Sequence, residues 1–168
     1  MLKRLSRFIS TGFYSGLAPK APGTVGTLFC ALLMWILWNI LPLDHTYYLI
    51  LSPLLLSMIS LLAGLIFIPL TYTDTKGTRS DEKSDKFDPQ EVVIDEFAGF
   101  LTTLAFLPPN NTSLVLAFVS FRIFDISKPW PVKLFEKLPR AWGVMLDDIV
   151  AGLMAGGLIY FARYLSLI

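Results

Sequence analysis

Long apolar segments alternate with short polar connections along this chain of 168 residues. Two segments, residues 25–43 and 47–70, contain no lysine, arginine, aspartate or glutamate. About 20 consecutive apolar residues are enough for a helix to cross the hydrocarbon core of a bilayer. Both segments are therefore predicted to be transmembrane helices.

Three further segments carry charge at one end. Residues 92–108 and 112–125 are joined by a short turn of proline and asparagine, which predicts a helical hairpin. Each is short for a full span, so a re-entrant hairpin, or a compact bundle dipping partly into the bilayer, stays open. The last segment, residues 147–168, contains Gly152, Gly156 and Gly157, whose small size lets helices approach closely.

These elements predict one all-α domain over residues 1–168. Its architecture would be a polytopic membrane helical bundle of about five hydrophobic helices with cytoplasmic amphipathic segments. The composition agrees, because 54% of the residues are hydrophobic and only 16% are charged, whereas a soluble domain has about 25% charged residues. The net charge of +1 gives no basic face for nucleic acid.

The distribution of lysine and arginine predicts the orientation. All 14 except Arg163 lie in the N-terminal segment, between residues 76 and 86, or between residues 122 and 140. Positive charge favours the cytoplasmic side, so these three regions are predicted to be cytoplasmic. An odd number of spans would leave the C-terminus outside.

Acidic residues gather at the same predicted membrane face. They are Asp95 and Glu96, Asp125, and the pair Asp147 and Asp148. Oxygen ligands from several elements suit a hard cation such as Mg²⁺. Any one of these acids alone has an equally good structural explanation: Asp147 or Asp148, for example, as a helix cap. The whole set on one face favours a functional site.

Two basic residues complete this predicted site. Arg122 lies three positions before Asp125, and Lys128 repeats that spacing if the helix continues to Pro129. Arginine and lysine bind phosphate groups. Gly23 and Thr24 precede the first apolar segment, where backbone N–H groups can cradle a phosphate, although an ordinary turn and N-cap explains them equally well. Residues 128–140 are predicted to lie in the membrane interface, with Trp130 at the boundary.

Missing residue types exclude several chemistries. Cys30 is the single cysteine and His45 the single histidine. A cysteine phosphatase, a histidine-nucleophile lipid phosphatase and a Ser-His-Asp hydrolase are therefore excluded. Metal-assisted attack on phosphorus, by water or by an aspartate, remains.

Four blocks of sequence resemble the bacterial phosphatidylglycerophosphatase A family. They are GLAPKAPGTVGTL, DPQEVVIDEFAGF, FRIFDISKPWPVKLFE and GVMLDDIVAG, in this order. The resemblance implies a Mg²⁺-dependent enzyme of the bacterial inner membrane, with its active site on the cytoplasmic side. It would hydrolyse the terminal phosphomonoester of phosphatidylglycerophosphate to phosphatidylglycerol, in phospholipid biosynthesis.

The resemblance also adds Asp88, which the residues alone would place in a turn. The expected metal ligands are Asp88, Asp95, Glu96, Asp125, Asp147 and Asp148. Catalytic roles are expected for Asp95, Glu96, Asp125 and Asp148, and substrate binding for Arg122, Lys128, Thr24 and Gly23. Membrane lipids are the expected partners, and the oligomeric state is left open. The alternative function is a transporter or channel subunit that uses the acids and Arg122 as an ion relay.

Overall fold

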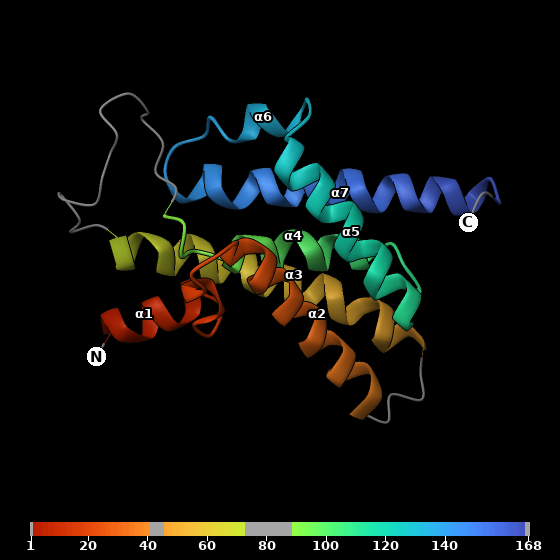
Figure 1. Ribbon diagram of the computed structural model, residues 1–168, viewed down its shortest axis with the longest axis horizontal. Coiled ribbons are helices and arrows are strands. Elements are labelled where there is room, and N and C mark those ends of the chain that lie inside the picture. Colours follow the sequence, from red (N-terminus) through yellow and green to blue (C-terminus); the bar gives the residue numbers. More distant parts are fainter. Residues whose placement is uncertain (1, 41–45, 73–88, 167–168) are drawn as a thin grey trace.

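The computed structural model describes residues 2–40, 46–72 and 89–166, and the regular elements of this part of the chain are all helices (Figure 1). The elements are α1 (Leu2–Ser10), the 3₁₀ turn η1 (Ser15–Leu17), α2 (Pro22–Ile40), α3 (Thr46–Tyr72), α4 (Ile94–Leu104), α5 (Asn111–Ser127), α6 (Val132–Phe135) and α7 (Ala141–Tyr164).

Helix α4 forms the centre of the bundle, packed between α3 and α7 (Figure 1). Every residue of α4 is buried except Glu96, which is partly buried. Its 11 residues rise only about 16 Å, roughly half the hydrocarbon thickness of a bilayer. Helix α4 is therefore a core helix, and the acids of its first turn, Asp95 and Glu96, are held inside the protein.

Glycines bring α4 and α7 into backbone contact. A Cβ atom on Gly152 of α7 would lie 2.2 Å from the carbonyl oxygen of Gly99 in α4, and one on Gly156 would lie 2.4 Å from the Phe106 ring. The predicted close approach is confirmed at these two positions. Gly157 has nothing within 4 Å of such a Cβ and takes no part.

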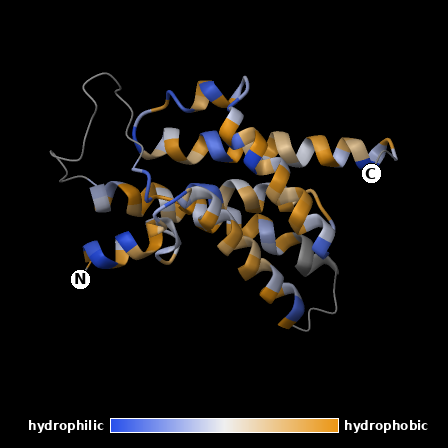
Figure 2. Ribbon diagram, in the orientation of Figure 1, coloured by the Kyte–Doolittle hydropathy of each residue, from blue (hydrophilic) through white to orange (hydrophobic). Residues whose placement is uncertain are grey.

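Within the described ranges, three helices are long and apolar enough to cross a membrane: α2, the part of α3 from Leu51 to Tyr72, and α7. The expected number of about five hydrophobic membrane helices is not confirmed. Many residues of these helices are hydrophobic (Figure 2). Many of these hydrophobic side chains are exposed, as expected for contact with lipid. Helix α5 has 17 residues and begins at Asn111. The residue before it, Asn110, is the N-cap, and its side chain accepts a hydrogen bond from the Ser113 amide.

Helix α7 begins at Ala141 rather than at Asp147. The prediction that its first residue is Asp147 is wrong, because the apolar stretch before the two acids continues the same helix. Asp147 and Asp148 are therefore interior helical residues, and the explanation of either as an N-cap is wrong too.

The N-terminal segment is tied to the loop that leads into α4. The Val93 amide donates to the Ser10 carbonyl (3.1 Å), and Arg7 pairs with Glu91 (2.7 Å). The Arg7 pair raises the pKa of this guanidinium further, chiefly through its hydrogen bond to Glu91. This segment fixes where α4 begins and hence where its acids lie.

Candidate active site

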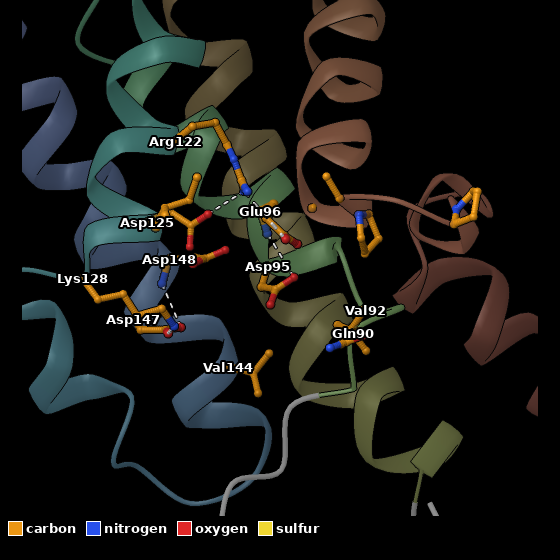
Figure 3. Close-up of a pocket in the computed structure, with 15 residues that line it drawn as sticks. Gln90, Val92, Asp95, Glu96, Arg122, Asp125, Lys128, Val144, Asp147 and Asp148 are labelled. Carbon is orange, nitrogen blue, oxygen red and sulfur yellow. Dashed lines mark hydrogen bonds and ion pairs between the residues drawn. The ribbon is translucent and has the colours of Figure 1, made fainter. Parts of the chain in front are cut away.

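A cavity of about 530 Å³ opens where the first turns of α2 and α4 meet the end of α5 and the second and third turns of α7 (Figure 3). Most of the charged residues that the sequence singled out line it. The lining residues are Pro19, Ala21, Pro22, Gly23, Gln90, Val92, Asp95, Glu96, Arg122, Asp125, Ile126, Lys128, Val144, Asp147 and Asp148.

Three carboxylates form an acidic trio in this cavity: Asp95, Glu96 and Asp148. Each offers one oxygen, and these oxygens all lie within 4.8 Å of one another. Asp95 and Asp148 are buried, and the Oε2 atom of Glu96 is buried with no hydrogen-bond partner in the described part of the chain. Buried carboxylates are costly without compensating positive charge. The donor set and the unpartnered oxygen both fit a hard divalent cation.

The surroundings of Glu96 oppose its ionisation. The pKa of Glu96 is raised to about 8, chiefly by burial and further by the charges of Asp148 and Asp125. The hydrogen bond with Asp95 and the charge of Arg122 act in the opposite direction. The cause is mainly the removal of the carboxylate from water. A cation bound to the acidic trio would favour the ionised form.

Arg122 extends from α5 to the edge of the acidic trio. Its Nη1 atom lies 2.5 Å from Asp125 Oδ2 and 3.9 Å from Glu96 Oε1, and its Nη2 atom donates to Thr24 Oγ1 at 3.4 Å. Its Nε atom is buried and has no partner among the described residues. Each terminal nitrogen of the guanidinium carries two N–H groups, and Nη2 uses one of them for Thr24. A guanidinium with a remaining donor can bind a phosphate oxygen.

The first turn of α2 comes close to these groups. A Cβ atom on Gly23 would lie 2.0 Å from Glu96 Oε1 and 3.2 Å from Arg122 Nη1. Only a glycine leaves room here for the carboxylate. Thr24 does not line the cavity, and its hydroxyl accepts a hydrogen bond from Arg122. Gly23 thus borders the cavity directly, whereas Thr24 helps to hold the guanidinium.

Lys128 lies just past the end of α5. The helix ends at Ser127, and Lys128 has a left-handed backbone (φ 41°, ψ 59°). The condition for Lys128 to repeat the spacing of Arg122 and Asp125, a helix that continues to Pro129, is therefore not met. Its Nζ atom contacts Asp147 Oδ2 at 2.6 Å and Glu136 Oε1 at 3.1 Å. Burial by itself would lower the pKa of Lys128, but these two carboxylates outweigh it and raise the pKa. Lys128 therefore joins the ends of α5 and α6 to α7.

Eight of the ten residues that the sequence predicted for the site line the cavity. They are Gly23, Asp95, Glu96, Arg122, Asp125, Lys128, Asp147 and Asp148. Asp88 lies outside the described residues. Sequence reasoning missed Glu136, because it placed residues 128–140 in the membrane interface, and missed Gln90, an uncharged residue in a turn. The pairing of Glu136 with Lys128 depends on the turn after α5, and the sequence analysis did not predict this pairing.

Comparisons with known proteins support one family. A family model described as Phosphatidylglycerophosphatase A matches residues 8–163. Phosphatidylglycerophosphatase A of Escherichia coli is 37% identical over 91% of this chain and 80% of its own length. The Haemophilus influenzae protein of that name is 33% identical over 97% and 94%.

A differently named relative is similar to the same extent. A putative phosphatidylinositol-3-phosphatase of Bacteroides thetaiotaomicron is 37% identical over 93% of this chain and 92% of its own length. No solved structure matches this chain. The family model and the two relatives above each cover most of the chain. The chain therefore belongs to the phosphatidylglycerophosphatase A family of phosphatases.

Proposed function

We propose that this protein hydrolyses the terminal phosphomonoester of phosphatidylglycerophosphate with the help of Mg²⁺, releasing phosphatidylglycerol and phosphate. The observation that carries the proposal is the acidic trio beside Arg122, in a cavity of a helical bundle with three candidate spans. A hard cation and a guanidinium are the two groups that phosphoryl transfer most often uses to offset charge on phosphate oxygens.

Each part of the cavity has a task in this proposal. Asp95, Glu96 and Asp148 would hold the ion, which supplies charge neutralisation at the phosphate and lowers the pKa of water. Arg122 would direct the second N–H of its Nη2 atom at a phosphate oxygen and thereby orient the phosphomonoester. Water attacks phosphorus, the bond to the glycerol oxygen breaks, and that oxygen takes up a proton.

Asp125, Asp147 and Lys128 complete the proposed machinery. Asp125 holds Arg122 through its short ion pair, which fixes the direction of the guanidinium. Asp147 and Lys128 form a second ion pair on the cavity wall, where Lys128 offers its remaining N–H to the anionic head group. Positioning of this kind accounts for much of the rate enhancement in phosphoryl transfer.

We place the protein in the bacterial inner membrane, with the cavity on the cytoplasmic side and the reaction in phospholipid biosynthesis. The distribution of lysine and arginine supports this orientation, because Lys128, Lys133, Lys137 and Arg140 all lie near the cavity end of the bundle. A phosphatase so placed would reach lipids made in the inner leaflet.

The deciding experiment measures phosphate release by the detergent-purified protein. Phosphatidylglycerophosphate and phosphatidylinositol 3-phosphate would be supplied separately, with Mg²⁺ and then with EDTA, because the Bacteroides relative has a name that refers to the second lipid. We expect metal-dependent release from phosphatidylglycerophosphate and a lower rate from the inositol lipid. Release that is unchanged by EDTA would overturn the metal role. No release from folded protein would overturn the activity and favour the ion-relay alternative.

A further inference from the structure

Helix α5 carries a continuous stripe of apolar side chains on its outer face. Val115, Val119, Ile123 and Ile126 follow one another at intervals of four, four and three residues, so they share one helical face. All four are exposed, from 48% at Val119 to 71% at Ile126. The stripe rises about 16 Å along the helix, over a large part of one bilayer leaflet.

The stripe ends at the cavity. Ile126 lines the cavity next to Asp125 and close to Lys128. Among the described residues it is the only exposed large apolar side chain that does so, because Val92 and Val144 are buried. A molecule with a polar head in the cavity can therefore leave it over Ile126 without placing an apolar tail against charged groups.

Helix α3 offers a comparison within the same molecule. Leu55, Ile59, Leu62 and Ile66 form a stripe with nearly the same spacing and a similar exposure. None of them lines the cavity. Both stripes would contact membrane lipid in general, but only the one on α5 is continuous with the proposed reaction centre.

From this continuity we infer that the end of the α5 stripe, Ile123 and Ile126, binds an acyl chain of the lipid whose phosphate group occupies the cavity. The inference rests on the proposed function and adds the route by which the lipid enters, sideways from the leaflet past the end of α5. Asp125 and Lys128 lie at the polar end of this route and Ile126 at its apolar end. The substrate would thus be recognised as a lipid and not only as a phosphomonoester.

The first test compares two double variants, Ile123→Ala/Ile126→Ala on α5 and the matched control Ile59→Ala/Leu62→Ala on α3. Each is assayed with long-chain phosphatidylglycerophosphate and with a short-chain, water-soluble analogue. For the α5 variant we expect KM for the long-chain lipid to rise about five- to tenfold, because apolar contact with the chain is lost. For this variant, KM for the short-chain analogue should stay near the wild-type value. For the control variant, KM for both substrates should stay near the wild-type values.

Equal effects of the two double variants on the long-chain lipid would overturn the inference, because the α5 stripe would then be ordinary lipid-facing surface. An equal rise in KM for the short-chain analogue would overturn it too. Failure of the proposed function would give a different result, because the wild-type protein would then hydrolyse neither the long-chain lipid nor the short-chain analogue.

A second test does not depend on turnover. A photoreactive amino acid is placed at position 126 or at position 59, and the protein is irradiated in phosphatidylcholine nanodiscs that contain labelled long-chain phosphatidylglycerophosphate. Label captured several times more strongly at position 126 would support the inference. Equal capture at both positions would contradict it.

Discussion

Replacing Gly23 by alanine should separate activity from stability. The new Cβ atom would lie 2.0 Å from Glu96 Oε1, whereas real Cβ atoms stay at least 3.0 Å from such neighbours. The carboxylate oxygen must therefore move by about 1 Å, and a displacement of this size near a reaction centre costs about 10²-fold in rate. That factor corresponds to about 2.7 kcal/mol of activation free energy.

The stability of the same variant should hardly change. The displaced atom is the end of a flexible side chain, and alanine is favoured over glycine in a helix by about 1 kcal/mol. Phosphate release and the thermal midpoint would be measured together on Gly23→Ala and on Gly157→Ala, whose Cβ atom meets nothing within 4 Å. We expect the control to keep full activity. If Gly23→Ala also kept activity within about threefold of the wild type, the reasoning that Glu96 must stay where it is would be refuted.

The remaining predictions test the acids, the helix contact and the metal. Asp95→Asn should abolish phosphate release and leave membrane insertion unchanged; activity near the wild-type rate would remove Asp95 from the catalytic set. Gly152→Ala should lower the thermal midpoint clearly, since its Cβ atom would meet the Gly99 carbonyl oxygen at 2.2 Å and backbone cannot move aside; an unchanged midpoint would show that α4 and α7 have room to separate. Glu96 has a pKa of about 8 in the folded, metal-free protein, against an ordinary value of 4.5. Between these two pH values the folded protein binds more protons than the unfolded chain, so its free energy of unfolding falls as the pH rises from 4.5 to about 8. Mg²⁺ should therefore raise the thermal midpoint more at pH 8 than at pH 5, because at low pH it must displace protons; an equal shift at both pH values would contradict a metal site that includes Glu96.

Sequence patterns predicted the parts of the fold that depend on composition. The apolar runs of α2 and α3 indicated helices, and both are long and apolar enough to span a membrane. The length of apolar sequence around residues 92–108 did not reveal that α4 is buried by protein on all sides. Burial by protein and burial by lipid select the same side chains, so hydrophobicity alone does not distinguish them.

The residues of the site were easier to predict than their pairings. Charged residues are few in this apolar chain, and a charged residue near the membrane needs a partner or a function. Asp95, Glu96 and Arg122 could therefore be identified as site residues from the sequence. Which acid pairs with which base depends on a few backbone angles, such as the left-handed turn that directs Lys128 to Asp147 and Glu136 instead of along α5. Pro129 indicates that α5 ends near Lys128, because the residue before a proline is biased away from the helical conformation, but a pattern of residue types does not say which acids the lysine then reaches.

The contact of Gly99 with Gly152 has a consequence for how this family could diversify. It joins the helix of Asp95 and Glu96 to the helix of Asp148 through main-chain atoms, so this contact does not depend on the chemistry of any side chain. Gln90 and Ile126 line other parts of the cavity and belong to neither helix. Substitutions at positions such as Gln90 and Ile126 could therefore change which head group or acyl chain the cavity accepts, while the arrangement of the three acids stays the same.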